Sequence, residues 1–223
     1  MTPSPVGVLV PAAGLGLRLG RGAPKALREL AGEPLLVHAV RGLRAAPSVG
    51  PVVVAAPADD VEAVAALLAP YDVVVVAGGA ERQDSVRRAL RALDAAVELV
   101  LVHDAARCLT PPALVEAVVA ALRAGAEAVV PVLPVADTVK SVAGSTVVAT
   151  LDRTALRAVQ TPQGFARPVL ERAHAAGLPA VTDDAGLVEL CGGTVSTVPG
   201  SEEAFKVTRP IDLLLAEAVL RGR

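Results

Sequence analysis

The chain has 223 residues, 53% of them hydrophobic and 1% aromatic, which suits one α/β domain with a core of Val, Leu and Ala. Its formal net charge of -2 gives no electrostatic reason to expect binding to nucleic acid or to a membrane. The N-terminal apolar run is too short for a signal peptide, no stretch is long enough to span a bilayer, and two cysteines make no disulfide framework, so we expect a cytoplasmic protein.

Strand-like apolar runs alternate with helical patterns along most of the chain. The runs that predict strands are 6–10, 52–55, 73–76, 99–103 and 128–132. The patterns that predict helices cover 34–46, 59–69, 82–93, 111–124, 168–176, 183–191 and 211–221. Continuous Val and Leu strands are typical of a parallel sheet buried on both faces. We therefore predict one α/β domain over 1–223, a Rossmann-like, mostly parallel sheet with helices on both faces and ligands beyond the carboxyl ends of its strands.

The first predicted strand leads into a loop of small residues. They are Pro11, Ala12, Ala13, Gly14 and, after one leucine, Gly16. Small side chains let the backbone approach a bulky anion, and N–H groups in such a turn can cradle phosphate oxygens. Arg18 and Lys25 follow and can neutralise charge that develops on a phosphorus centre. The segment predicts a phosphate-binding loop, and the alternative is a tight turn with solvated arginines.

Two other glycine-rich loops fit this segment less well. A Walker A loop needs Ser or Thr after its lysine, and here Ala26 follows Lys25. A dinucleotide-binding fingerprint needs a third glycine where this chain has Leu19. Lysine usage draws further attention to Lys25, because the chain has three lysines against eighteen arginines. A position that needs a compact point charge beside a phosphate would resist replacement by the planar fork of arginine.

The segment after the strand 73–76 combines two glycines with polar residues. Gly78 and Gly79 permit a sharp turn, and Asp84 and Ser85 lie in the first turn of the next predicted helix. Their side chains can hydrogen-bond a base edge or a ribose, or they can cap the helix. The residues alone favour neither interpretation.

The strand 99–103 ends in another polar cluster. A carboxylate at this position, Asp104, is a natural magnesium contact if it lies beside a phosphate loop. Arg107 can hold a phosphate through two hydrogen bonds, and the alternative is an ion pair between the two residues at the rim of the sheet. We interpret His103 as a packed strand residue and not as an acid or base.

The segment 137–153 interrupts the α/β alternation. Two short β-type runs, 138–142 and 146–151, flank Ala143-Gly144-Ser145, which predicts a hairpin. Because a two-stranded hairpin is unstable alone, it must pack on something, and a second subunit is a natural candidate. Arg153, at the end of this arm, is a candidate phosphate ligand or a surface arginine.

Two polar segments in the C-terminal part of the chain each allow two interpretations. Thr182-Asp183-Asp184 opens a predicted helix, and capping explains it at least as well as ligand binding does. Lys206 precedes the last predicted helix, where it either faces the site or lies on a solvated loop.

Taken together, these segments resemble the 2-C-methyl-D-erythritol 4-phosphate cytidylyltransferase family over nearly the whole chain. The matching segments, in order, are VPAAGLGLRLG with PKA, GGAERQDSV, VHDAARC, ADTVK, LDRTALRAVQTPQGF, TDDAGLVE and KVTRPIDL. The resemblance implies transfer of CMP from CTP to 2-C-methyl-D-erythritol 4-phosphate, which releases pyrophosphate and forms 4-diphosphocytidyl-2-C-methyl-D-erythritol in non-mevalonate isoprenoid biosynthesis. The phosphate of the polyol is then the nucleophile, so catalysis rests on positioning and charge neutralisation.

The resemblance also implies roles for single residues. Arg18 and Lys25 stabilise charge on the α-phosphate and on the leaving pyrophosphate, while Arg153 and Lys206 orient the polyol phosphate. The CTP site takes Pro11, Ala12, Ala13, Gly14, Gly16, Gly79, Asp84 and Ser85. The polyol phosphate site takes Asp104, Ala105, Arg107, Thr138 and Thr161. Mg²⁺ is bound mainly through the CTP phosphates, with Asp104 as its candidate protein contact, and the arm makes a homodimer with shared active sites.

Other functions stay open on the sequence alone. Within the fold, the acceptor can be another polyol phosphate such as ribitol 5-phosphate. From other classes, the chain can be a nucleotide-binding oxidoreductase or an inactive binding module; the broken dinucleotide fingerprint argues against the first, and the set of candidate cations with Asp104 argues against the second. The chain also departs from the family at Cys108, where proline is usual, and we interpret this cysteine as structural because the chemistry has no use for a thiolate.

Overall fold

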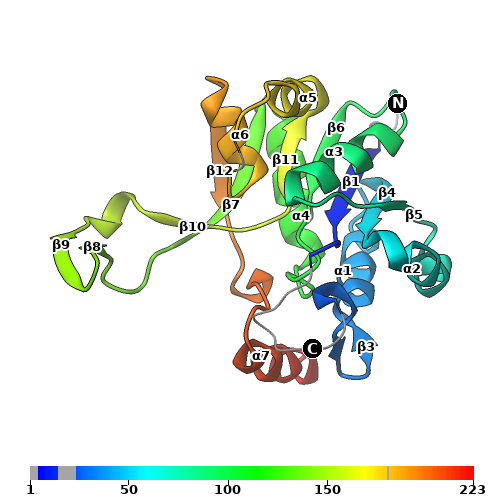
Figure 1. The fold of residues 1–223 in the computed structure, drawn as a ribbon, viewed down its shortest axis with the longest axis horizontal. Helices are drawn as coiled ribbons and strands as arrows, with labels where there is room; N and C mark the ends of the chain where they lie inside the picture. Colours follow the sequence, from blue (N-terminus) through cyan, green and yellow to red (C-terminus); the bar gives the residue numbers. More distant parts are fainter. Residues whose placement is uncertain (1–4, 15–23, 180) are drawn as a thin grey trace.

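A mixed sheet at the centre of the molecule brings the ends of the predicted strands together. The computed structural model describes residues 5–14, 24–179 and 181–223. Within these ranges the main sheet has eight strands in the order β10-β7-β11-β6-β1-β4-β5, with β12 also paired to β7 (Figure 1). The strands are β1 (Val6–Pro11), β4 (Val49–Ala56), β5 (Val74–Ala77), β6 (Leu99–Val102), β7 (Ala128–Pro134), β10 (Arg157–Val159), β11 (Gln163–Ala166) and β12 (Val195–Pro199). Because β6, β1, β4 and β5 are parallel, their carboxyl ends meet at one edge.

Helices cover both faces of this sheet, as predicted. They are α1 (Leu35–Arg44), α2 (Val61–Leu68), α3 (Arg82–Ala92), α4 (Pro112–Arg123), α5 (Arg167–Ala175), α6 (Asp184–Leu190) and α7 (Pro210–Arg221). Apolar side chains of α1, α2 and α4 form one core with the sheet, and those of α3, α5 and α6 form a second. Alternate residues of β1 divide between the two cores, since Val8 and Val10 belong to the first and Leu9 to the second. The predicted fold class is confirmed.

Three strands of the sheet were not predicted, and β11 shows why. It runs antiparallel between β6 and β7 and interrupts the parallel order. Its Gly164 packs directly under α4, because a Cβ at this position would lie 2.6 Å from Val118 Cγ1. A strand of four residues that needs a glycine for close packing carries almost no apolar pattern, so its sequence does not indicate a strand.

The predicted hairpin is present and stands away from the body of the molecule (Figure 1). Its strands β8 (Lys140–Ala143) and β9 (Thr146–Thr150) pair antiparallel in a sheet of their own. Gly144 turns the chain between them with φ 57°, which favours glycine. Every residue from 140 to 150 is exposed, and the exposed fractions of Val142, Val147 and Val148 are 59%, 55% and 65%. The described part of the chain therefore leaves the apolar side chains of the arm uncovered.

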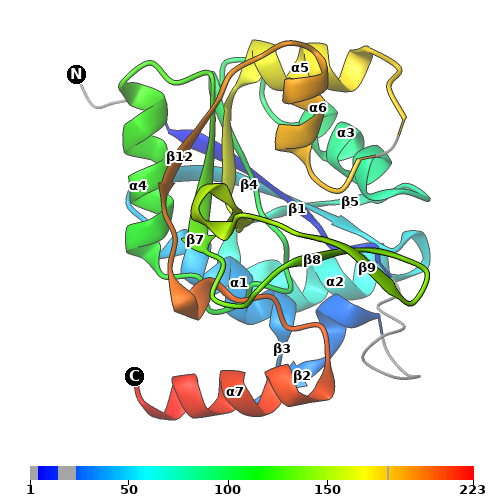
Figure 2. The ribbon, with the colours of Figure 1, turned by 90° about the vertical axis from the view of Figure 1, so that its left-hand side faces the viewer.

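The chain ends in α7, which lies below the sheet in both views (Figure 2). Ala216 of this helix joins an apolar cluster with Leu30, Leu35, Cys108 and Val207. The cluster ties the loop after β6 to the segment before α7, and a small hairpin of β2 (Glu29–Leu30) and β3 (Glu33–Pro34) lies beside it. Among the helices that the structure describes, none combines the length and apolar character needed to cross a bilayer.

Candidate functional site

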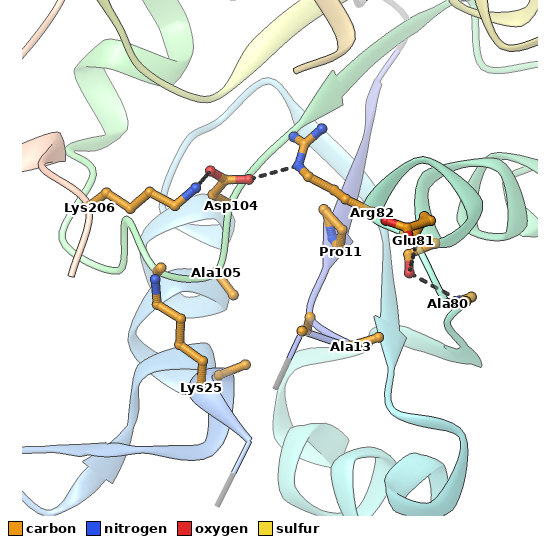
Figure 3. Close-up of a pocket in the computed structure, with 15 residues that line it drawn as sticks. Pro11, Ala13, Lys25, Ala80, Glu81, Arg82, Asp104, Ala105 and Lys206 are labelled. Atoms are coloured by element: carbon orange, nitrogen blue, oxygen red, sulfur yellow. Dashed lines mark hydrogen bonds and ion pairs between the residues drawn. The ribbon is translucent and has the colours of Figure 1, made fainter. Parts of the chain in front are cut away.

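A cavity of about 260 Å³ lies at the carboxyl ends of β1, β5 and β6 (Figure 3). Ten residues proposed from the sequence line it: Pro11, Ala12, Ala13, Gly14, Lys25, Gly79, Ser85, Asp104, Ala105 and Lys206. They come from four separated segments of the chain, which the fold brings to one place. The expectation that ligands bind beyond the carboxyl ends of the strands is thus matched by a cavity with the predicted small residues and cations.

The first loop forms one wall of this cavity. Ala12 is buried, and its backbone N–H donates to the Ala55 carbonyl at 2.8 Å, which extends the pairing of β1 with β4. That N–H is therefore unavailable to a phosphate, and the part of the loop that can approach a ligand begins at Ala13 and Gly14. Gly16 and Arg18, which were proposed to continue this loop, lie outside the described residues.

The turn after β5 closely approaches the first loop, and its glycines make this possible. A Cβ on Gly78 would lie 2.5 Å from the Ala13 Cβ, and a Cβ on Gly79 would lie 2.1 Å from the Asp84 Cβ. Ser85 Oγ accepts a hydrogen bond from the Gly79 N–H at 3.1 Å, which holds the turn in place. Any side chain at either glycine would open this wall of the cavity.

Asp84 caps the helix, which was one of its two proposed roles. It forms a capping box with Glu81 at the start of α3, and its carboxylate also pairs with Arg87. The hydrogen bond from Arg87 lowers the pKa of Asp84 below its ordinary value. Asp84 is absent from the cavity lining, whereas its neighbour Ser85 is part of it. The capping interpretation therefore describes Asp84, and Ser85 is the one of the two that is placed to contact a ligand.

Asp104 lies between two cations at the end of β6 (Figure 3). Lys206 Nζ donates to its Oδ2 at 2.7 Å, and Arg82 Nε donates to its Oδ1 at 3.3 Å. Burial by itself raises the pKa of Asp104, but the charges of Arg82 and Lys206 lower it more, so the net pKa lies well below its ordinary value. Asp104 is a carboxylate at neutral pH, and it fixes both cations at the cavity wall.

Hydrogen bonds fix the backbone at Asp104 and next to Lys206. The backbone N–H of Asp104 donates to Thr161 Oγ1 at 3.0 Å, and the Val207 N–H donates to the Ala106 carbonyl at 2.8 Å. Thr161 is buried and does not line the cavity, so it acts here by holding Asp104. The segment that carries Lys206 is docked on the loop after β6, which resolves its position in favour of the site.

His103 is packed in the core, as we interpreted it, and it directly follows β6, which ends at Val102. Its ring is fully buried, with Nδ1 3.2 Å from Thr161 Oγ1. Burial lowers the pKa of His103 to about 4, so the ring is neutral near pH 7. Nε2 is buried with no hydrogen-bond partner in the described residues, and the side chain does not line the cavity.

Arg107 makes hydrogen bonds that were not predicted. Its guanidinium donates to the Ala204 carbonyl at 2.8 Å and to the Val159 carbonyl at 3.0 Å, and it does not line the cavity. These bonds tie the loop after β6 to β10 and to the segment before Lys206. Nε of Arg107 is buried without a hydrogen-bond partner among the described residues, and the proposed contact of Arg107 with a phosphate stays a prediction.

Thr138 and Arg153 belong to the arm and do not line the cavity either. Arg153 begins a short 3-10 helix, Arg153–Ala155, and its guanidinium donates to the Ala136 carbonyl. Both side chains are exposed, and the arm projects away from the site of its own chain (Figure 1). Their proposed contact with the polyol phosphate stays a prediction.

Arg82 lines the cavity and was not proposed from the sequence. It is the first residue of α3, and its guanidinium joins Asp104 to the buried Asp184 at the start of α6, with Nη1 2.6 Å from Asp184 Oδ2. Ala26, Ala80, Glu81 and Ala106 complete the lining. One signal could have found Arg82: position 82 opens a helix that follows a parallel strand, so it must lie at the ligand-binding edge.

The described residues do not form a metal site of their own. Among them, no group of three or more His, Cys, Asp or Glu side chains gathers where it could hold a metal ion. Both oxygens of Asp104 already accept from cations, so a direct metal contact would require Arg82 or Lys206 to move. This donor set does not fit a metal held by the protein alone.

Cys108 lies in the apolar cluster below the site, where 3% of it is exposed. Burial raises the pKa of Cys108 to about 12, so the thiol stays protonated near neutral pH. The structural interpretation of this cysteine fits its environment.

Known proteins share both the sequence and the fold of this chain. Residues 6–222 match the 2-C-methyl-D-erythritol 4-phosphate cytidylyltransferase family. The enzyme of that name from Frankia casuarinae is 63% identical over 216 residues, which cover 96% of this chain and 81% of the relative. The crystal structure of the Thermus thermophilus enzyme of that name is 40% identical with a TM-score of 0.78, and the match covers 97% of this chain and 99% of that one.

A second solved structure agrees with the first. The 4-diphosphocytidyl-2C-methyl-D-erythritol synthase from Anaerococcus prevotii is 28% identical with a TM-score of 0.85, and the match covers 98% of this chain and 99% of that one. The family match includes the segments that build the cavity, from the loop after β1 to Lys206. The chain therefore belongs to the 2-C-methyl-D-erythritol 4-phosphate cytidylyltransferase family.

Proposed function

We propose that the protein transfers CMP from CTP to 2-C-methyl-D-erythritol 4-phosphate and releases pyrophosphate. The observation that carries this proposal is the cavity at the sheet edge, which combines a loop of small residues with Lys25, Arg82, Asp104 and Lys206. Membership of the family over residues 6–222 names the two substrates. A cavity lined by cations suits two substrates that both carry phosphate groups.

The reaction needs position and positive charge more than it needs an acid or a base. A phosphate oxygen of the polyol attacks the α-phosphorus of CTP, the bond to the β-phosphate oxygen breaks, and pyrophosphate leaves with the electron pair. Lys25 and Lys206 bring positive charge to the cavity from different segments (Figure 3). A compact ammonium group can follow the negative charge as it moves to the leaving group.

Asp104 has a supporting role in this scheme. As a carboxylate it keeps Lys206 and Arg82 in place, and it offers an acceptor to a hydroxyl group of the polyol. It is not required as a general base, because the attacking phosphate is already ionised at neutral pH. His103, neutral and outside the cavity, has no part in proton transfer.

Magnesium enters this proposal as part of the substrate. We propose that a divalent cation, Mg²⁺, arrives bound to the phosphates of CTP, since the carboxylate of the site is already paired with two cations. The residues that would face this complex are the first loop and Lys25. Phosphate oxygens and water are ligands that Mg²⁺ accepts readily.

We also propose a homodimer in which the arm completes the site of the neighbouring subunit. The arm carries Val142, Val147 and Val148 exposed, and it holds Arg153 and Thr138 away from the cavity of its own chain. Two-fold packing of arms would bury the valines and bring Arg153 to the partner's polyol phosphate. We place this enzyme in the cytoplasm, where its two free cysteines, Cys108 and Cys191, stay reduced.

A pyrophosphate-release screen tests the function. Each of the four ribonucleoside triphosphates is combined with a panel of polyol phosphates, with and without Mg²⁺. We expect release only with CTP, 2-C-methyl-D-erythritol 4-phosphate and the divalent cation together. Faster turnover of ribitol 5-phosphate would replace the proposed acceptor, and no release from any pair would support an inactive binding module.

A further inference from the structure

A chain of ion pairs leads from the cavity into the core on the side of α5 and α6. Arg82 touches Asp104 in the cavity wall and Asp184 behind it, at 3.3 Å and 2.6 Å. The other oxygen of Asp184 lies 2.9 Å from His174 Nε2 on α5. Asp184 is fully buried and the His174 side chain is 4% exposed, whereas the Arg82 side chain is 28% exposed and lines the cavity. This series of ion pairs thus has one end in the cavity and the other in the core.

Asp184 is itself held firmly. Asp183 caps α6 by accepting from the Gly186 N–H at 3.1 Å, and it also accepts from Gln163 Nε2 at 2.6 Å. Gln163 Oε1 in turn accepts from the Ala185 N–H at 3.1 Å. Gln163 is fully buried on β11, so the start of α6 is fastened to the sheet on both sides of Asp184. The carboxylate that faces Arg82 has little freedom to move.

Burying this carboxylate is costly unless it is fully paired. Burial raises the pKa of Asp184, but the hydrogen bond from His174 and the charge of Arg82 lower it more, so it stays ionised. Two apolar residues of similar volume would join α5 to α6 without this cost. The one feature that an apolar pair could not reproduce is a fixed orientation of the Arg82 guanidinium.

We propose that Asp184 and His174 are positioning residues of the active site, which hold Arg82 so that it shares Asp104 with Lys206. This inference rests on the proposed function. With Asp184 neutral, Arg82 has Asp104 as its remaining carboxylate partner and turns both nitrogens toward it. Lys206 then loses its partner at Oδ2, and the guanidinium fills space at the cavity wall where the polyol phosphate is expected to bind.

The first test replaces the charge of Asp184 and keeps its shape. We expect Asp184→Asn to lower kcat/KM for the polyol phosphate about 10- to 100-fold, while the Kd of CTP changes less than about 3-fold. A crystal structure of the variant should show Arg82 bonded to both oxygens of Asp104. Unchanged kinetics per folded molecule, with only a lower melting temperature, would show that Asp184 is structural and overturn the proposal.

A double-mutant cycle tests whether Asp184 acts through Arg82. If it does, adding Asp184→Asn to Arg82→Gln causes no further loss beyond about 3-fold, because the group that it positions is already gone. Losses that multiply in the double variant would contradict the proposal. All variants are compared with wild-type enzyme in the same assay, so failure of the proposed function appears as an inactive wild type, whereas failure of this inference leaves the wild type active.

His174 offers the test with the closest control. His174→Ala should reproduce part of the loss in kcat/KM, about 5- to 20-fold, and His174→Gln should restore most of it by supplying a donor to Asp184. The control is His38→Ala on α1, because each histidine is 8% exposed as a whole residue and His38 Nε2 also bonds a neighbouring group, the Leu30 carbonyl, at 2.9 Å, with Glu33 Oε2 at 3.9 Å. We expect the control to lose stability and keep its kinetics.

A further test is chemical rescue of the His174→Ala variant with imidazole. His174 lines a second cavity of about 300 Å³ between α3 and α5, so imidazole can reach the space left by His174→Ala. We expect added imidazole to raise kcat/KM of this variant several-fold and to leave Asp184→Asn unchanged. Equal effects on His174→Ala and His38→Ala, or full activity of His174→Ala without imidazole, would overturn the proposal.

Discussion

The cavity at the sheet edge and the β8–β9 arm belong to one chain but are held in opposite ways. At the cavity, Asp104 is paired with two cations, its backbone is held by Thr161, and the strands below it are almost fully buried. In the arm every residue from 140 to 150 is exposed, and the hydrogen bonds of the two strands run only between them. The first region is pre-organised by its own chain, and the second lacks anything in the described chain to pack on.

Under the proposed homodimer, this difference separates two parts of the site. The cations proposed to neutralise charge on CTP are placed by the fold of a single subunit, because the parallel strands bring their segments to one edge. Groups proposed for the polyol phosphate, Thr138 and Arg153, are placed by a hairpin, and a lone two-stranded hairpin is at best marginally stable in water. Experiments that damage each region separately should therefore have separable effects.

The largest effect is expected in the pre-organised region. Lys25→Ala should lower kcat by about 10²- to 10³-fold, since it removes one charge partner of the transition state. Lys25→Arg is the matched variant and should also be impaired, because a planar guanidinium does not replace an ammonium group in a tight loop. Steady-state kinetics with both substrates measure this. Near-normal turnover of folded Lys25→Ala would remove Lys25 from the reaction.

The second prediction tests whether the cavity of one subunit works together with the arm of the other. Arg153→Ala should impair use of the polyol phosphate and spare CTP binding. If Arg153 acts on the neighbouring subunit, a mixed dimer of Lys25→Ala and Arg153→Ala has one site with both lesions and one intact site. After random exchange of equal amounts, about half of the dimers are mixed, so activity should return to about one quarter of the wild-type value.

Subunit exchange must be measured in the same mixture, for example with differently tagged chains. The control mixes Lys25→Ala with Lys206→Ala, two residues of the same cavity, and this mixture should stay inactive. If the first mixture stays inactive despite exchange, Arg153 serves its own subunit and the division of the site between two chains is wrong.

The contrast between the buried sheet and the exposed arm also explains which elements could be predicted from the sequence. Strands such as β1 and β6 are continuous apolar runs with helices on both faces, so their pattern alone identifies them. The arm was also predicted, because β-branched residues around Gly144 indicate a hairpin. Strands β10 to β12 were missed because β10 has three residues, β11 is short and contains a glycine, and β12 ends in a proline, so none of them has a distinct pattern.

Within the site, the sequence predicted which residues line the cavity better than it predicted which side chains pair with one another. Lys25 was proposed from the small-residue loop, Asp104 from its place at a strand end, and Lys206 from the family resemblance, and all three line the cavity. Arg82 and the ion pair with Asp184 were missed, because the two residues are 102 positions apart and no local pattern links them. The resemblance supplied roles for Arg107 and Thr161 at the polyol phosphate, which stay predictions, and their hydrogen bonds to neighbouring loops were not predicted.

A smaller effect is expected on stability, and it tests whether the residues behind the cavity are tightly packed. The ordinary pKa of His103 is 6.5 and burial lowers it to about 4, so the unfolded chain binds this proton first as the pH falls. The free energy of unfolding should therefore decrease by about 2 kcal/mol between roughly pH 7.5 and pH 5. Buried Asp104 and Asp184 act below this window, since their pKa values are lowered from 3.8 and their contribution is lost only as the pH falls below it.

His103→Asn isolates this contribution. Asparagine can keep a hydrogen bond to Thr161 and does not titrate, so the decrease between the two pH values should largely disappear. Urea denaturation of both proteins at both pH values measures it. An unchanged pH dependence in the variant would show that another group is responsible.

The smallest effect is expected at Cys108, which lies beneath the cavity and beside the loop that carries Asp104. Its thiol is buried and protonated, and an in-line attack by a substrate phosphate has no use for it. Cys108→Ser should therefore keep kcat within about 2-fold of wild type, while burying a hydroxyl lowers the free energy of unfolding by about 1–2 kcal/mol. Cys108→Ala is the matched variant, which removes the thiol without adding a polar atom. A large loss of turnover in both variants, at full folding, would mean that this cluster controls the position of Asp104 and Lys206 more tightly than their direct contacts indicate.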